Sequence, residues 1–280
     1  MRLGGCLAGS FKNVDEWLNA VKTIGYSAVP FPLQPDAERA EIKEYMEAMR
    51  ENDILNAEVG AWSNPLSPDA SVREAAMRKN IAALELAEET GAHCCVNIAG
   101  SLSDVWDGPQ KKNLDRETFD MIVKNTRAII DAVNPIKTKY TLETMPWIFP
   151  DSPENYVRLC EAIDRKAFGV HLDICNMINC PERYFGIPDF IDRSFALLGD
   201  LTVSIHLKDI KLSNKMTVHI GEVHPGEGDM DFTRLFQRSA KLDRNVTMII
   251  EHLGNNEDYA GAYKHLRNII VAAGLESCLI

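Results

Sequence analysis

Residues 140–174 read YTLETMPWIFPDSPENYVRLCEAIDRKAFGVHLDI, a short apolar run, a longer stretch of helical period and a second short apolar run. The same alternation fills the chain, and it is typical of a parallel sheet whose strands are joined by crossover helices. We predict strands at Leu3–Ala8, Ser27–Phe31, Leu55–Trp62, His93–Ala99, Tyr140–Met145, Phe168–Ile174, Leu201–Ile210 and Val246–Leu253. We predict helices at Val14–Ile24, Ala37–Glu51, Val72–Thr90, Glu117–Val133, Pro153–Ile163, Ile187–Leu198, Phe232–Ala240 and Glu257–Ala273.

Eight β/α units in 280 residues match one closed barrel better than an open two-domain sheet, because (β/α)8 barrels run to about 250 residues around a single core. No linker rich in Gly, Ser or Pro divides the chain. We therefore predict an α/β fold, a single (β/α)8 TIM barrel that forms one domain over residues 1–280. Helix signals agree, since Ser152 precedes Pro153 and since Gly25, Gly91 and Gly274 lie where helices should end.

Composition is that of an ordinary soluble globular protein, with 45% hydrophobic and 25% charged residues. The net charge of −11 argues against a general nucleic-acid binder, which needs a basic surface. No apolar stretch of about 18 residues and no signal peptide are visible, so we expect a cytoplasmic protein without a membrane partner. The cysteines, 7 in number, form neither a disulfide framework nor a CxxC zinc pair, which favours reduced, mostly buried thiols.

Two connections are longer than a barrel needs, and both follow predicted strands at the end where a barrel assembles its active site. They are Gly100–Asn113 and Lys211–Met230, and we expect both to be substrate loops. The second contains a predicted small strand at Thr217–Ile220 and a tight turn within Glu222–Gly228.

A residue with metal-ligating chemistry interrupts, or directly ends, each of the last four apolar runs. These residues are Glu143, Asp173, His206 and Glu251. Three carboxylates and an imidazole that converge in a barrel mouth are costly to bury without a cation. Their donor set suits a six-coordinate divalent ion such as Mn2+, Mg2+ or Co2+, with positions left for water or substrate. Each residue alone could be a helix cap or a salt-bridge partner, but four on consecutive strands favour a shared metal site.

On these residues the chain resembles the xylose isomerase-like TIM barrels that are grouped as sugar phosphate isomerases and epimerases. The resemblance covers nearly the whole chain and is most specific in residues 142–147, 170–173, 204–209, 224–228 and 249–251. It implies that Glu143, Asp173, His206 and Glu251 bind one divalent ion, Mn2+ first, with Mg2+, Co2+ or Zn2+ as alternatives. It also implies that Glu143 and Glu251 double as the catalytic acid and base.

This chain differs from better-known branches of the family, and the differences narrow the range of expected substrates. Ketose 3-epimerases carry a His three residues after the Asp ligand, where this chain has Asn176, and their second substrate-binding Glu has no counterpart in residues 144–149. These differences argue against the epimerisation of a free ketose. The related DNA-repair endonucleases use three metals and more His ligands, two of which are absent from residues 58–62 and 96–99.

Several further residues are candidates for substrate binding. His171 lies on the same strand face as Asp173, so a substrate contact and a hydrogen-bonded core histidine are equally favoured. Asn176 and Lys208 could hold sugar hydroxyls or an oxyanion, although Lys208 could equally pair with Asp209 on the surface.

Aromatic and loop residues supply the other candidates. Trp62 and Trp147 end strands and could stack on a sugar, or they could cap the barrel core. We expect one of Glu222, His219 and His224 to touch substrate, with Glu222 as the leading candidate.

The reaction we predict is proton abstraction next to a carbonyl of a carbohydrate, through an enediolate, with Glu143 and Glu251 as the proton-transfer pair. This describes a metal-dependent sugar, sugar phosphate or keto-sugar isomerase or epimerase. The alternative is a lyase or dehydratase, similar to inosose dehydratases or to deglycosidases of 3-keto C-glycosides, and a third reading is a non-catalytic sugar-binding barrel. Motifs for dinucleotide binding, P-loop phosphoryl transfer and α/β-hydrolase catalysis are absent. The sequence is also compatible with a homo-oligomer.

Overall fold

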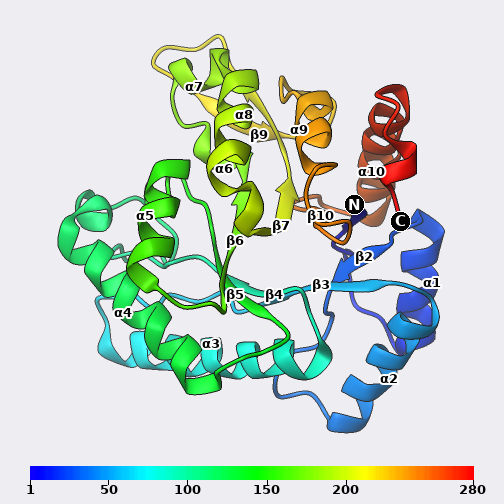
Figure 1. Ribbon diagram of the computed structural model, residues 1–280, viewed down its shortest axis with the longest axis horizontal. Coiled ribbons are helices and arrows are strands. Elements are labelled where there is room, and N and C mark those ends of the chain that lie inside the picture. Colours follow the sequence, from blue (N-terminus) through cyan, green and yellow to red (C-terminus); the bar gives the residue numbers. More distant parts are fainter.

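The structure is a computed structural model that describes residues 1–280. Its parallel strands close into a barrel in the order β1-β10-β7-β6-β5-β4-β3-β2 (Figure 1). The strands are β1 (Arg2–Gly5), β2 (Ala28–Pro30), β3 (Leu55–Gly60), β4 (Cys94–Asn97), β5 (Lys139–Glu143), β6 (Phe168–Asp173), β7 (Thr202–Leu207) and β10 (Thr247–Ile250). Because β1 pairs with both β2 and β10, the sheet has no free edge. The predicted (β/α)8 barrel is confirmed.

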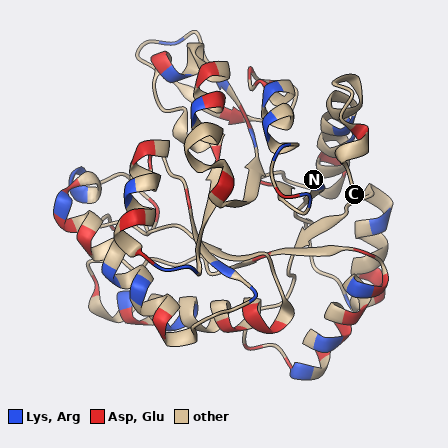
Figure 2. Cartoon of the chain, viewed as in Figure 1, with Lys and Arg blue, Asp and Glu red and all other residues tan.

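Helices surround the barrel (Figure 1). They are α1 (Val14–Ile24), α2 (Arg39–Glu51), α3 (Ala70–Thr90), α4 (Arg116–Val133), α5 (Pro153–Ile163), α6 (Ile174–Met177), α7 (Pro181–Phe185), α8 (Ile187–Leu198), α9 (Phe232–Ser239) and α10 (Asn256–Ala272). Three short 3-10 helices lie at η1 (Lys111–Leu114), η2 (Gly199–Leu201) and η3 (Glu276–Cys278). Lys and Arg alternate with Asp and Glu along these outer helices in the view of Figure 2.

Local sequence explains where the predicted helices begin and end. The Ser152 side chain accepts a hydrogen bond from the backbone N–H of Asn155 in α5, and Pro153 occupies the first turn. Gly25 and Gly91 end α1 and α3 in the left-handed conformation, at φ of 97° and 69°. Gly274 also has a positive φ, but it follows the capping residue Ala273 of α10.

Tyr156 of α5 aligns the two strands that carry the first part of the predicted site. Its buried hydroxyl donates a hydrogen bond to the carbonyl of Leu142 and accepts one from the backbone N–H of His171, at 2.5 and 3.1 Å. Beyond it, the Thr144 hydroxyl donates to the carbonyl of Asp173 at 2.6 Å and accepts from the Asp173 N–H at 3.0 Å. The ends of β5 and β6 are therefore held in register.

The structure of the loop after β7 differs from two of the predictions. Strand β7 ends at Leu207 rather than Ile210, and an antiparallel hairpin of β8 (Asp209–Leu212) and β9 (Ile220–Val223) follows. The small strand expected at Thr217–Ile220 thus begins only at Ile220.

The tight turn of that loop is built on Asp209, which is 1% exposed. Its carboxylate accepts backbone N–H bonds from Gly226, Gly228 and Met230 at 2.9–3.0 Å. A Cβ atom on Gly228 would lie 2.3 Å from Asp209 Oδ1, and Gly226 has a φ of 100°. The two glycines of the HPGEG segment are therefore required by close approach and by backbone conformation.

Two further expectations can be compared with the structure. All seven cysteines are free, as expected, but only Cys94, Cys95 and Cys175 are buried, so the expectation of mostly buried thiols is wrong. The other four, Cys6, Cys160, Cys180 and Cys278, lie outside the barrel strands and are partly exposed. None of the helices is both long and apolar enough to cross a membrane.

Candidate active site

Four residues from neighbouring strands converge at the carboxyl end of the barrel. Glu143 ends β5, Asp173 ends β6, His206 lies in β7 and Glu251 directly follows β10. All four side chains are buried, and their potential ligand atoms lie within 4.8 Å of one another. The structure thus brings together the four residues that the sequence pattern selected.

The His206 ring lies between Glu58 on one side and Glu143 and Glu251 on the other. Its Nδ1 atom is 2.8 Å from Glu251 Oε1 and 3.2 Å from Glu143 Oε1. Its Nε2 atom is 3.2 Å from Oε1 of Glu58. A ring that donates its Nε2 proton to Glu58 presents the Nδ1 lone pair to the four-residue cluster, as a metal ligand must.

Glu58, in β3, is a site residue that the sequence reasoning missed. It is 3% exposed, and its Oε2 atom accepts from His171 Nε2 at 3.0 Å, so one carboxylate contacts two histidines. Burial alone would raise the pKa of Glu58, but His206 and His171 lower it to about 2. The available signal was a charged residue inside the apolar run Leu55–Trp62, the same pattern that marked the last four strands.

Lys208 points into the barrel mouth, and Asp209 is itself buried, so the alternative of a surface pair between the two residues is wrong. Its Nζ atom lies 2.6 Å from Glu251 Oε1, 2.8 Å from Asp173 Oδ2 and 3.4 Å from Glu143 Oε1. Lys208 is two residues after His206, so strand alternation places both on the inner face, while Asp209 turns to the loop. This ammonium group partly neutralises the buried carboxylates.

The charges of the cluster shift the pKa values of its members. Burial raises the pKa of the Asp173 carboxyl group to about 7. Burial disfavours the charged form of His206, but the nearby Glu251, Glu58 and Glu143 outweigh this effect and raise its pKa well above the ordinary value. Protons therefore compete with any other cation for this site.

The four residues fit a divalent metal ion. Asp173 Oδ2 and Glu251 Oε1 are buried and accept no hydrogen bond, although both lie in ion-pair contact with Lys208. Asp173 Oδ1, in contrast, is used by the backbone N–H of Asn176 at 2.9 Å. Three hard oxygen donors and one imidazole nitrogen are the ligands that Mg2+ or Mn2+ accepts.

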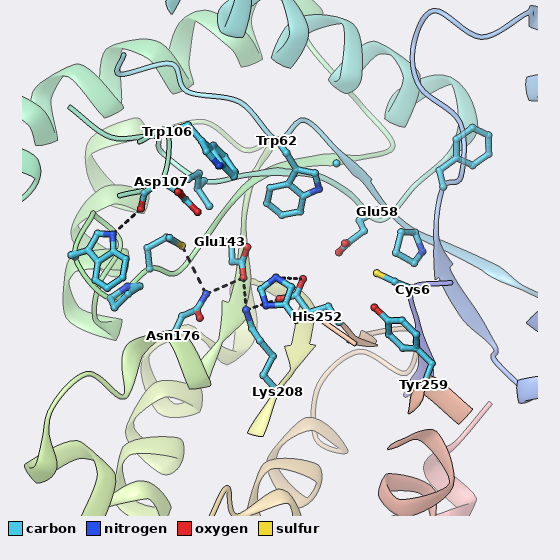
Figure 3. Close-up of a pocket in the computed structure, with 18 of the residues that line it drawn as sticks. Cys6, Glu58, Trp62, Trp106, Asp107, Glu143, Asn176, Lys208, His252 and Tyr259 are labelled. Atoms are coloured by element: carbon cyan, nitrogen blue, oxygen red, sulfur yellow. Dashed lines mark hydrogen bonds and ion pairs between the residues drawn. The ribbon is translucent and has the colours of Figure 1, made fainter. Parts of the chain in front are cut away.

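A cavity of about 650 Å3 opens beside this cluster (Figure 3). Glu143 and Glu251 border the cavity, whereas Asp173 and His206 do not. Lys208 and Asn176 also border it, and Asn176 Nδ2 donates to Glu143 Oε1 at 3.1 Å. The two glutamates are thus the cluster carboxylates that a molecule in the cavity would meet.

The other candidate substrate contacts divide into two groups. Trp62 and Trp147 border the cavity, together with Trp106, which the sequence reasoning did not single out. His171 is fully buried against Glu58 and borders no part of this cavity, so the geometry favours the core alternative for it.

The loop candidates lie farther out. Glu222 is exposed and does not border the cavity, but its Oε2 atom is 3.0 Å from Nδ1 of His252, which does. His219 and His224 are exposed and border no part of the cavity.

Comparison with known proteins adds a family and a set of similar folds. The family model described as "Xylose isomerase-like TIM barrel" matches residues 18–269. Comparison with curated protein sequences finds no significant match. Among solved structures, D-psicose 3-epimerase from Clostridium cellulolyticum H10 is similar with a TM-score of 0.71 at 16% identity, over 96% of this chain and 99% of that chain.

Two further solved structures illustrate the range of this fold. A 3-keto-D-glucoside 4-epimerase from E. coli has a TM-score of 0.68 at 16% identity, over 96% of this chain and 99% of its own. A xylose isomerase-like TIM barrel protein from Mycobacterium smegmatis, in complex with magnesium, has a TM-score of 0.69 at 13% identity, over 93% of this chain and 88% of its own. At these identities the likeness concerns the fold.

Proposed function

Because this chain belongs to the xylose isomerase-like TIM barrel family, we propose that it is a divalent-metal-dependent isomerase or epimerase of a keto-sugar. The observation that carries the proposal concerns the four residues Glu143, Asp173, His206 and Glu251. Their side chains converge, but among these four only Glu143 and Glu251 border the cavity. Two carboxylates that face the same cavity can act on one substrate as base and acid. The names of the similar solved structures, among them two sugar epimerases, support a carbohydrate substrate.

In the proposed reaction, one of the two glutamates removes the proton from the carbon next to the substrate carbonyl. The electron pair moves into the carbon–carbon bond and the carbonyl oxygen gains negative charge, which gives an enediolate. In an isomerisation, the proton of the neighbouring hydroxyl passes to this oxygen, so that the carbonyl re-forms at the other carbon. In an epimerisation, the hydroxyl keeps its proton. The other glutamate returns a proton to the second carbon, or to the other face of the first carbon. A proton on the second carbon gives isomerisation, and a proton on the other face of the first carbon gives epimerisation.

Other residues of the site would hold the substrate in place for these transfers. Lys208 and Asn176 border the cavity with donor groups that can bind the carbonyl oxygen and a hydroxyl group. Glu143, Asp173, His206 and Glu251 would hold the metal, with Mn2+ as the first choice. Its positive charge would stabilise the negative charge that develops on the substrate oxygens.

A lyase is the second candidate function, since an enediolate can also expel a substituent from the adjacent carbon. The observation in its favour is the pair of exposed indoles at the cavity, Trp106 and Trp147, which could contact a substituent larger than a hydroxyl group. The same two glutamates would then remove the proton and protonate the leaving group.

The test is hydrogen exchange at substrate carbon. Purified protein loaded with Mn2+ would be incubated in D2O with ketoses, inososes and 3-keto glycosides, and the recovered sugars analysed by mass spectrometry and NMR. We expect deuterium at one carbon next to the carbonyl, and none with protein treated with a chelator. Binding of a sugar without any exchange over this panel would instead indicate a non-catalytic sugar-binding barrel.

A further inference from the structure

The charges around the cavity are unfavourable for a phosphorylated substrate. Four carboxylates border it, those of Glu58, Asp107, Glu143 and Glu251, and its only basic residues are Lys208 and His252. No arginine borders the cavity, although arginine is the usual bidentate partner of a phosphate group.

Both basic residues are already paired. Lys208 Nζ contacts Asp173 and Glu251 at 2.8 and 2.6 Å, and His252 Nδ1 contacts Glu222 at 3.0 Å. Outside the proposed metal site, a phosphate dianion would therefore meet negative charge without an unpaired basic side chain.

The usual phosphate-binding position of a TIM barrel is also unfavourable for a phosphate group, because acidic residues lie there. That position uses backbone N–H groups at a helix N-terminus near the last strands. In α10, the helix after β10, the Asn255 side chain already accepts from the N–H of Asp258, and the first turn carries the acidic residues Glu257 and Asp258.

Part of the cavity wall is aromatic. Trp62, Trp106 and Trp147 border the cavity, from the end of β3 and from the loops after β4 and β5. Figure 3 shows the first two of these indoles near each other. Trp62 lies next to the cluster, with its ring centroid 6.5 Å from that of His206. Trp106 and Trp147 remain 41% and 40% exposed, which is high for indole rings that border a cavity.

The two outer tryptophans belong to loops that are joined to each other. Trp147 Nε1 donates a hydrogen bond to the carbonyl of Asp107 at 2.8 Å, next to Trp106 in the chain. This bond uses the polar atom of the indole and leaves its apolar faces available. The hydrogen bond therefore links the two loops that bring Trp106 and Trp147 to the cavity, where both indoles offer apolar surface to a ligand.

From these observations we propose that the substrate is an uncharged keto-sugar that carries an apolar or aromatic substituent, with the sugar ring beside Trp62 and the substituent between Trp106 and Trp147. This inference rests on the proposed function for the choice of a keto-sugar. The charge pattern and the aromatic part of the wall are independent of the reaction.

The test uses two matched pairs of ligands and Mn2+-loaded protein, with binding measured by calorimetry. The first pair is D-fructose and D-fructose 6-phosphate, and the second is the methyl and phenyl glycosides of 3-keto-D-glucose. We expect the phosphate ester to bind at least about tenfold more weakly than the free sugar, and the phenyl glycoside at least about tenfold more tightly than the methyl glycoside.

Substitutions at Trp106 and Trp147 test whether these two indoles cause the preference for the phenyl glycoside. Trp106→Ala and Trp147→Ala should each weaken binding of the phenyl glycoside more than binding of the methyl glycoside, whereas Trp147→Phe should retain most of the phenyl preference. Ile136→Ala, at a side chain that is 91% exposed and outside the cavity, is the matched control. Equal binding of the two glycosides, or tighter binding of the phosphate ester, would overturn the inference.

Failure of this inference and failure of the proposed function give different results. Selective binding of the phenyl glycoside without solvent deuterium in any sugar supports the binding preference and rejects the isomerase. Deuterium exchange that favours fructose 6-phosphate supports the isomerase and rejects the uncharged, substituted substrate.

Discussion

The imidazole of His206 is held between Glu58 and the cavity carboxylates, with Nε2 at 3.2 Å from Glu58 Oε1 and Nδ1 at 2.8 Å from Glu251 Oε1. A carboxylate on the far side of a ligand histidine fixes the ring orientation and its tautomer. Glu58 therefore acts on the metal site through His206, and its side chain also borders the cavity.

Glu58→Gln should weaken metal binding by about 10- to 100-fold, because an amide oxygen and an amide N–H cannot both accept from His171 and His206. Calorimetric titration with Mn2+ measures this change, and the visible spectrum of the Co2+ form reports an altered ligand geometry. Glu85→Gln, on the exposed face of α3, is the control. An unchanged affinity and spectrum would show that His206 does not need Glu58.

Metal affinity should rise with pH between about 6 and 8. In the absence of metal, the raised pKa of His206 and the pKa of Asp173, about 7, keep protons on both groups toward the acidic side of this range. A metal ion must displace those protons, so affinity is lost as pH falls. Calorimetry in buffers of different ionisation enthalpy should detect proton release on binding. Proton uptake, or an affinity independent of pH, would contradict the assignment.

Lys208→Met should tighten metal binding and reduce turnover. The ammonium group competes for the oxygens of Asp173 and Glu251, so its removal frees these ligands for a metal. Without metal, the unpaired carboxylates should destabilise the fold by about 3–5 kcal/mol. We therefore expect a lower melting temperature for the metal-free variant and a larger rise on addition of Mn2+ than in the unaltered protein. The exposed Lys43→Met is the control, and an unchanged metal affinity would argue against the competition.

Glu251→Gln should leave the barrel folded, because the amide is nearly isosteric, and should lower turnover by about a hundredfold or more. Exchange in D2O then separates the two glutamates. If exchange survives while product formation stops, Glu143 removes the first proton and Glu251 returns it. If exchange and product formation both match those of the exposed control Glu44→Gln, the proposed pair of glutamates is wrong.

Periodicity predicted most of the fold because the helices carry their own signals. The bounds of α1, α5 and α8 agree with the expected ranges, since apolar spacing and capping residues are local features. Strand ends were predicted too long, as at Leu201–Ile210, because apolar composition does not show where the chain leaves the sheet.

The candidate site was predictable where strand alternation constrains side chains. The convergence of Glu143, Asp173, His206 and Glu251 follows from their positions at strand ends, and the same alternation places Lys208 beside them. Glu58 was missed because β3 lies away from the other ligand strands in sequence, and only the closed barrel brings it to His206. Trp106 lies in a loop without periodicity, so no local pattern could place it at the cavity.

The opposite directions of Lys208 and Asp209 have a consequence for engineering. Lys208 faces the cluster, and the adjacent Asp209 holds the turn at Gly226 and Gly228, so a change to that turn would strain the backbone at the cluster itself. Residues 213–219 are free of this anchor, and Val218 lies in a groove that also contains Trp147. A directed-evolution library for new substrates should therefore vary residues 213–219 and keep residues 225–230 constant.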